Sequence, residues 1–330
     1  MIDRPIQSAS IATVTSLSAT IRLALFGISP AECSFDRRGF AARDDRARRH
    51  LENVGAAFVF GYRSLLAHDD AAAMADALDA QPDLLRGFAW EGAAMAAELL
   101  DTVTPWNRRR LTRLLEGRGA DHSYMLHVGA GWAMARLRRG IPRALAGMDP
   151  LLRWLAVDGY GFHEGFFHHD RVLPRPQRRF AGAAGHAFDQ GLGRSLWFVR
   201  GADPQAIGEA IAALPAERHA DMWSGVGLAA AYAGGVSERQ LRQLVHLAGE
   251  HHPELAQGVA FAACARTHAA NLVEHTEQAC QVVCSASARR VSAIVDDCRV
   301  GLGADHGEDT AYERWRQRIA ARFGAVESAA

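Results

Sequence analysis

The feature that most constrains the fold is a four-residue frame of glycine, apolar, small and aromatic residues that occurs three times. A glycine of a second repeated block precedes each copy, and Gly55, Gly129 and Gly227 stand 32, 30 and 31 residues before the frame. Spacing this constant indicates three related units, at about residues 46–105, 118–170 and 216–285. The three copies read Gly87-Phe88-Ala89-Trp90, Gly159-Tyr160-Gly161-Phe162 and Gly258-Val259-Ala260-Phe261.

Each unit is expected to be a hairpin of two helices. Pro82-Asp83 and Pro253-Glu254 precede two of the frames, and proline followed by an acid is typical of a first helical turn. Small residues one turn apart let another helix approach closely, so packing explains the frame itself. Alanine-rich segments without alternating β-branched residues favour an all-α fold. The sequence therefore predicts three tandem helical hairpins in one domain at 38–330, an amphipathic segment at 1–37, and further helices at 203–214 and 308–324.

The middle and last units are separated by extra chain. Successive units begin 74 and then 98 residues apart, which predicts an irregular insertion at residues 170–200. Pro174 and Pro176 would break a helix, and Gly191-Leu192-Gly193-Arg194-Ser195 reads as a flexible turn before an apolar run. Whether this insertion forms a lid is left open.

Composition excludes several classes of function. All 37 residues counted as lysine or arginine are arginine, so Schiff-base chemistry, a pyridoxal phosphate anchor and a P-loop are excluded. Net charge is zero, which predicts no nucleic-acid partner. Five scattered cysteines without a CxxC pair argue against a zinc ribbon or a disulfide framework, and they favour the cytoplasm. No apolar run reaches the roughly 18 residues of a transmembrane helix.

Only the middle frame continues into a cluster of ionisable residues. Aligning the frames places Glu91, His163 and Ala262 at one position, so packing requires neither histidine nor glutamate there. Glu164 and His168 share a helix face at i, i+4 and would suit general acid–base catalysis or part of a metal site. Two ligands do not make a site, and a histidine near a helix end is also favoured by the helix dipole. No metal or other cofactor is therefore predicted.

The remaining candidates surround this cluster. Aromatic walls with a few polar groups describe a pocket for an apolar, conjugated ligand, and they equally describe an ordinary core. One polar helix stripe in the last unit, which includes His268, is an exposed face or a pocket lining. The candidate catalytic residues are His163, Glu164, His168, Asp189 and Arg194. The candidate substrate-binding residues are Glu91, His127, Trp132, Tyr160, Phe162, Phe166, Trp197, Trp223, Asn271 and His275.

Several longer strings resemble a known family. They are Arg86-Gly87-Phe88-Ala89-Trp90-Glu91-Gly92, His127-Val128-Gly129-Ala130-Gly131-Trp132, Asp158-Gly159-Tyr160-Gly161-Phe162-His163-Glu164-Gly165-Phe166, Phe188-Asp189-Gln190-Gly191-Leu192-Gly193-Arg194 and Trp223-Ser224-Gly225-Val226-Gly227-Leu228. From about Arg38 to Arg290 the chain resembles the family called domain of unknown function 1702, whose members occur in bacterial gene clusters for enediyne and related polyketide natural products. The resemblance implies a role in natural-product biosynthesis, on a polyene-like intermediate. It supplies no catalytic residues.

Three functions follow as hypotheses. In the first, the protein binds an apolar polyene-like intermediate, and His163 and Glu164 transfer protons during isomerisation or cyclisation, with Asp189 and Arg194 as a polar gate. In the second, it is a non-catalytic carrier or assembly partner for other enzymes of the pathway. The third, a terpene-type cyclase, is weakened because Asp296-Asp297 has no third acid at the spacing used for magnesium. A homo-oligomer is compatible with each.

Overall fold

The computed structural model describes residues 16–68, 70–104, 106 and 108–324. Within this part of the chain the fold is all-α, as predicted, and the one β-type pairing is an isolated bridge between His306 and Asp309. Seven long helices form the centre of the domain. They are α3 (Asp45–Ala67), α5 (Asp83–Val103), α7 (Ser123–Arg136), α9 (Arg153–Val172), α10 (Gly182–Val199), α12 (His219–Tyr232) and α14 (His252–His268).

The other helices connect and cover the central seven. The predicted helices at 203–214 and 308–324 are present as α11 and α17. No helix in the described part is long and apolar enough to cross a membrane. The other helices are α1 (Leu17–Phe26), α2 (Phe35–Arg38), α4 (Ala71–Asp79), α6 (Arg110–Glu116), α8 (Ile141–Leu145), α11 (Pro204–Ala212), α13 (Glu238–Ala248), α15 (Glu274–Cys284), α16 (Ala288–Arg299) and α17 (Ala311–Gly324), with a 3-10 turn η1 at Pro30–Cys33; α17 is as long as α7 and α12 but lies outside the central seven.

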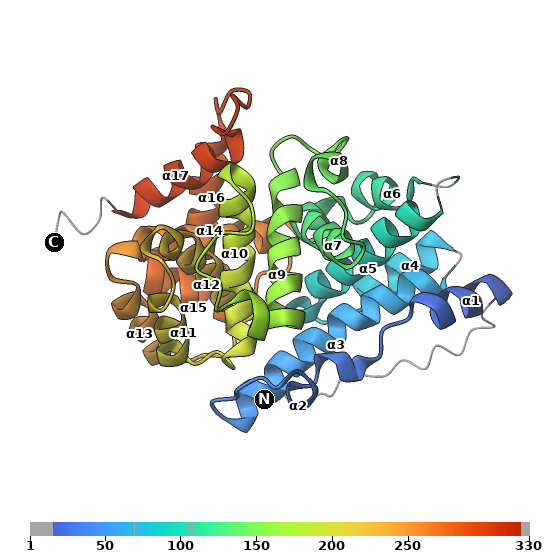
Figure 1. The fold of residues 1–330 in the computed structure, drawn as a ribbon, viewed down its shortest axis with the longest axis horizontal. Coiled ribbons are helices and arrows are strands. Elements are labelled where there is room, and N and C mark those ends of the chain that lie inside the picture. The colour runs from blue at the N-terminus through green and yellow to red at the C-terminus, as the bar shows by residue number, and fades with distance from the viewer. Residues whose placement is uncertain (1–15, 69, 105, 107, 325–330) are drawn as a thin grey trace.

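The long helices form one continuous row in which each long helix packs against the next long helix along the chain. The seams run α3–α5, α5–α7, α7–α9, α9–α10, α10–α12 and α12–α14. Figure 1 shows α9 and α10 side by side at the centre, with the N-terminal helices on one side and the C-terminal helices on the other. The row therefore has no break at the predicted insertion.

Glycines set the distance between neighbouring helices. A Cβ on Gly131 of α7 would lie 1.9 Å from the carbonyl oxygen of Ala156, and one on Gly159 of α9 would lie 2.0 Å from that of Val128. These contacts mirror each other, as antiparallel helices require, and leave no room for a side chain. The same reciprocal contact joins Gly61 with Gly92, Gly161 with Gly191, Gly193 with Gly225, and Gly227 with Gly258 across four further seams.

We call a glycine whose missing side chain faces the backbone of a neighbouring long helix a seam glycine. The seam glycines recur from helix to helix, and not only once in each predicted unit of two helices. In α7, α9, α10 and α12 two glycines stand two residues apart, and the first faces the preceding helix while the second faces the following one. From α5 to α14 the first seam glycine of each helix recurs after 30 to 37 residues. The first seam glycines are Gly92, Gly129, Gly159, Gly191, Gly225 and Gly258.

Two sequence expectations are corrected by this arrangement. Residues 182–199 form helix α10, so Gly191 and Gly193 lie inside a helix and the irregular insertion is wrong for this stretch. A glycine inside a helix is disfavoured by about 0.5–1 kcal/mol relative to alanine, which makes such a pair look like a turn, but here the missing side chains let three helices meet. In the first unit, Gly92 rather than Gly87 is the seam glycine, because Gly87 faces the hydroxyl of Tyr232 instead.

The two ends of the row meet. The ring of His50 in α3 lies 2.6 Å from the carbonyl oxygen of Ala233 after α12, and the buried guanidinium of Arg266 in α14 donates to the carbonyls of Asp83 and Leu84 at 3.1 and 3.2 Å. Residues 16–37 pack on α3, where the Tyr62 hydroxyl donates to the carbonyl of Phe26. Residues 1–15 of the predicted amphipathic segment lie outside the described chain.

Candidate functional site

An aromatic cavity lies inside the row, between residues of η1, α3, α5, α7, α9, α10 and α12. The space between the surrounding atoms is about 690 Å³, part of it open to solvent. The volume that the centre of a water molecule can occupy is only about 50 Å³. The cavity is therefore narrow, with room for a few waters or a slim molecule. Its aromatic lining consists of Phe58, Phe88, Trp132, Phe162, Phe166, Phe167, Phe198 and Tyr232.

The helical repeat explains how this lining arises. The residue three positions after the first seam glycine faces the cavity in α5, α7, α9, α10 and α12, because it lies just under one helical turn further along. Four of these five side chains are uncharged and apolar or aromatic, and α10 alone supplies a charge. The five residues are Met95, Trp132, Phe162, Arg194 and Leu228.

Glu91 and Arg194 are the polar pair of the cavity. The Glu91 side chain is 2% exposed; its Oε1 accepts from the indole of Trp132 at 3.1 Å and lies 3.9 Å from the Arg194 guanidinium. Burial raises the pKa of Glu91 to about 7, although Arg194 and Trp132 oppose the rise. Arg194 pairs with buried Asp158 and lies over the ring of Phe162, 4.9 Å from its centroid. A carboxyl group that can hold or release a proton near neutral pH thus faces an aromatic space.

A ladder of buried polar side chains continues from Asp158 across the row. The amide of Gln190 donates to Asp158 at 2.7 Å, and the Ser224 hydroxyl donates to Gln257 at 2.6 Å. Each of these residues, like Glu91, immediately precedes the first seam glycine of its helix. The paired residues hydrogen-bond to each other, as most buried polar groups do, although the side-chain amide nitrogen of Gln257 has no hydrogen-bond partner among the described residues. Glu91 differs because it faces the cavity.

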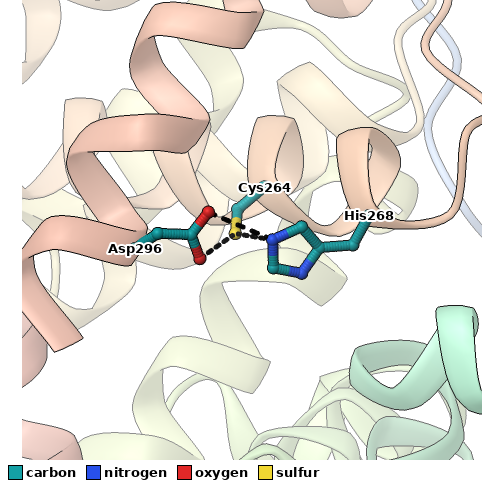
Figure 2. A group of neighbouring side chains, drawn as sticks. All are labelled: Cys264, His268 and Asp296. Atoms are coloured by element: carbon teal, nitrogen blue, oxygen red, sulfur yellow. Dashed lines mark hydrogen bonds and ion pairs between the residues drawn. The ribbon is translucent and has the colours of Figure 1, made fainter. Parts of the chain in front are cut away.

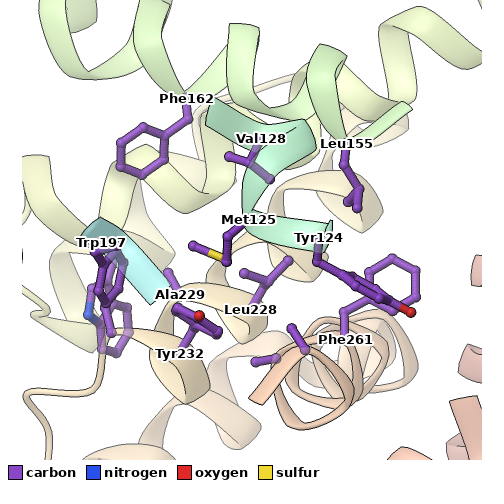
Figure 3. Packing of buried hydrophobic residues seen from close by; sticks show 14 of the residues in the cluster. Tyr124, Met125, Val128, Leu155, Phe162, Trp197, Leu228, Ala229, Tyr232 and Phe261 are labelled. Carbon is purple, nitrogen blue, oxygen red and sulfur yellow. The ribbon is translucent and has the colours of Figure 1, made fainter. Parts of the chain in front are cut away.

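A second, smaller cavity adjoins the first. Leu228, Tyr232 and Arg194 line both spaces and so separate them. Figure 3 shows Tyr124, Met125, Val128, Leu155 and Phe261 packed with Leu228 and Tyr232 between the helices. In this second cavity the centre of a water molecule can occupy only about 20 Å³, and the lining is almost wholly apolar.

His163 and Glu164 lie behind the cavity wall and are absent from the lining that the described residues form. His163 packs edge-on against Trp132, with ring centroids 5.7 Å apart, and its Nδ1 lies 3.5 Å from Glu164. Glu164 also pairs with Arg179 at 2.8 Å, and Arg179 donates to the Tyr160 hydroxyl. Burial lowers the pKa of His163, whereas His163 and Arg179 lower that of Glu164 against the effect of burial. This outer cluster touches the cavity only through its aromatic wall.

His168 interrupts the regular geometry of α9. Its φ and ψ of −137° and 31° are not helical, so α9 bends there and Glu164 and His168 do not occupy one straight helix face. The bend brings the ring of His168 within 6.3 Å of the ring of His163. Both histidines therefore belong to the outer cluster.

Asp189 belongs to an ion-pair network and not to the cavity lining of the described chain. The guanidinium of Arg218 holds both of its oxygens, at 2.9 and 2.6 Å, and Arg178 lies 3.0 Å away. Arg178 also reaches Asp221 at 2.6 Å, so this arginine, from the connection between α9 and α10 at residues 173–181, anchors the connection to the network. Of the predicted polar gate, only Arg194 faces the cavity.

The other predicted binding residues separate into two groups. Glu91, Trp132, Phe162 and Phe166 line the cavity. The second group lies elsewhere in the core. The rings of His127, Trp197 and His275 hydrogen-bond to the backbone carbonyls of Ser123, Gly234 and Tyr232, respectively. The backbone carbonyl of Asn271 accepts from Arg266, Trp223 is buried, and the Tyr160 hydroxyl accepts from Arg179. The sequence analysis did not name Met95, Leu228 or Tyr232, which also line the cavity. Met95 and Leu228 lie three residues after the first seam glycine of their helices, and that spacing could have identified them. Nothing in the sequence singles out Tyr232.

Comparison with known proteins identifies one family. The sequence model of the family described as protein of unknown function (DUF1702) matches residues 17–323, which is nearly the whole chain. No curated protein and no solved structure matches the chain.

Proposed function

We propose that this chain, which belongs to the DUF1702 family, binds a slim apolar molecule in its aromatic cavity and transfers protons on it through Glu91. The observation that carries the proposal is a buried carboxyl group with a pKa of about 7 in a wall of aromatic rings. A general acid or base is most effective when its pKa lies near the working pH. Glu91 meets that condition at neutral pH.

The chemistry suited to this site is acid-initiated rearrangement of a conjugated chain. Protonated Glu91 would add its proton to one carbon of a polyene and leave a delocalised cation. The faces of Trp132 and Phe162 favour a cation electrostatically. Loss of a proton from another carbon to the Glu91 carboxylate would restore the neutral molecule with a shifted double bond; attack by a remote double bond before that loss would close a ring.

The choice of ligand rests on two arguments. Narrow aromatic walls favour a thin, flat molecule over a bulky one. The resemblance to proteins of enediyne and polyketide gene clusters supplies such a molecule, a linear polyene. Arg194 would anchor a carboxylate or carbonyl at one end of it, because a buried guanidinium is a strong directional donor.

Binding is tested with trans-parinaric acid, a linear conjugated tetraene acid, by energy transfer from tryptophan. We expect saturable binding by the wild type and loss of binding by Leu228→Trp, which fills the cavity. Val300→Trp adds the same side chain at a position that is 76% exposed and should bind as the wild type does. Equal binding by both variants would place the ligand elsewhere.

Proton transfer is tested by deuterium uptake into a bound polyene in heavy water. Glu91→Gln should keep binding and lose uptake, since an amide is too weak an acid and too weak a base to transfer a proton to or from carbon. If Glu91→Gln exchanges normally while His163→Ala combined with Glu164→Ala does not, the outer cluster carries the chemistry instead. Binding without any uptake by the wild type would support the carrier function.

A further inference from the structure

A second cluster of chemically active side chains lies apart from the aromatic cavity, between α14 and α16. Cys264 and His268 stand one turn apart on α14, and Asp296 comes from α16. Figure 2 shows the thiol, the imidazole and the carboxylate pointing toward one another. We propose that these three residues bind a zinc ion, with one coordination position left open to solvent.

The separations between the three groups fit zinc. Sγ of Cys264 lies 3.7 Å from Nε2 of His268 and 3.8 Å from the nearer oxygen of Asp296, and Nε2 lies 3.2 Å from the other oxygen. Tetrahedral zinc with ordinary bond lengths would separate sulfur and nitrogen by about 3.6 Å, sulfur and oxygen by about 3.5 Å, and nitrogen and oxygen by about 3.4 Å. The sulfur–nitrogen separation is close to the required value, and because the other two distances are to the two different oxygens of Asp296, a small rotation of this carboxylate would bring one oxygen into place for the ion.

The arrangement does not suit a nucleophilic cysteine. In a relay of thiol, imidazole and carboxylate, the thiol and the carboxylate use different ring nitrogens. Here both approach Nε2 of His268. One neutral ring nitrogen carries either a proton or a lone pair, so it cannot donate to Asp296 and also accept from Cys264. A cation at the common point satisfies all three groups at once.

The ligand types select the metal. Sulfur, nitrogen and oxygen together suit zinc, whereas magnesium and calcium take oxygen ligands. Entry from solvent is open, because the side chains of His268 and Asp296 are 35% and 45% exposed while Cys264 is buried behind them. Three protein ligands with one open position are typical of zinc sites that bind water or substrate.

Tyr124 supports the thiol from α7. Its hydroxyl oxygen lies 3.5 Å from Sγ of Cys264, in reach to donate a hydrogen bond to a zinc-bound thiolate. Groups that hold a metal ligand in this way commonly change metal affinity about 10–100-fold when removed. Tyr124 is a positioning residue and not itself a ligand.

The test uses cobalt(II) as a coloured substitute for zinc, added to the full-length protein after metal removal. We expect one equivalent to bind with a thiolate-to-cobalt charge-transfer band and the intense visible bands of tetrahedral cobalt, and zinc to displace it. Cys264→Ser should abolish the charge-transfer band, and Asp296→Asn should weaken binding by more than about 10-fold. Asp297→Asn is the matched control, since this exposed neighbour is not part of the cluster.

The outcomes separate cleanly. Absence of stoichiometric cobalt and zinc binding by the folded wild type would overturn the proposal, as would a charge-transfer band that survives in Cys264→Ser. Circular dichroism of each variant shows whether it folds, and Tyr124→Phe, which keeps all three ligands, should retain the band with weaker affinity. Polyene binding in the aromatic cavity is measured separately and does not depend on this result.

Discussion

The glycine seams make a quantitative prediction for Gly193→Ala in α10. The new Cβ would lie 2.1 Å from the backbone oxygen of Met222, which is 1.3 Å short of the 3.4 Å at which ordinary contact begins. A backbone oxygen cannot rotate away, so α10 and α12 must separate or the methyl group must remain compressed. Overpacking of this kind destabilises by about 1–3 kcal/mol.

The same substitution at Gly208 of α11 provides the control. A Cβ there would meet only a side-chain carbon of Leu247 at 3.4 Å. Both variants gain the same helix-forming advantage of alanine, about 0.5–1 kcal/mol. The difference between them therefore isolates the overpacking, and we expect Gly208→Ala to be the more stable by about 1–3 kcal/mol.

Equilibrium urea unfolding measures both free energies. Circular dichroism and tryptophan fluorescence must report the same transition for the comparison to hold. Adding Gly225→Ala, the reciprocal contact on α12, to Gly193→Ala should destabilise by less than the sum of the single changes, because one separation of the helices relieves both clashes. If Gly193→Ala proved as stabilising as Gly208→Ala, the α10–α12 seam described here would be wrong.

Three further outcomes follow from buried groups. The pKa of Glu91 is about 7 in the folded state and near the ordinary 4.5 of a glutamate in the unfolded state, so the folded state keeps this proton to higher pH. The free energy of unfolding should therefore fall as pH rises from 4.5 to 7, by at most about 1.4 kcal/mol per pH unit, and Glu91→Gln should remove that part of the pH dependence in urea titrations. Asp189→Asn leaves the buried Arg218 without its bidentate partner and should lower stability by about 3–5 kcal/mol, whereas Glu238→Gln in an exposed pair should change it by less than about 0.5 kcal/mol. Arg266→Lys cannot reach the four carbonyls that the guanidinium holds and should lower the thermal midpoint, each lost buried bond weakening the fold by about 1–3 kcal/mol; an unchanged midpoint would show that the ends of the row meet without it.

The all-α class and the helix starts could be predicted because they are local. Pro82 immediately precedes α5 and Pro253 is the second residue of α14, so both lie at the helix starts that the sequence predicted. The positions at which neighbouring long helices contact each other could not be predicted in the same way. Gly191 and Gly193 are poor helix formers by themselves, and only the neighbouring backbones explain their presence in α10. Tertiary contact outweighs local preference at that helix.

The corrected register strengthens one sequence argument. The position of His163, four residues after the first seam glycine, holds alanine or serine in the other helices from α5 to α14, so packing there requires a small residue and not an imidazole. The residues compared are Ala96, Ala133, Ser195, Ala229 and Ala262. The outer cluster thus remains unexplained by the scaffold, although it lies behind the cavity wall.

The sequence named Glu91 as a binding residue and Arg194 as part of a polar gate, but it placed the proton transfer on His163 and Glu164. Comparing the helices singles out a polar residue only where the other helices have apolar or small ones. The position before the first seam glycine is polar in several helices, so this comparison does not single out Glu91. Asp158, Gln190 and Ser224 occupy that position as well, but they satisfy one another along the ladder. Glu91 is held instead by a ring nitrogen of Trp132 and by Arg194, both of which line the cavity. What distinguishes Glu91 is its partners, which come from two other helices, α7 and α10, and which no spacing in the sequence reveals.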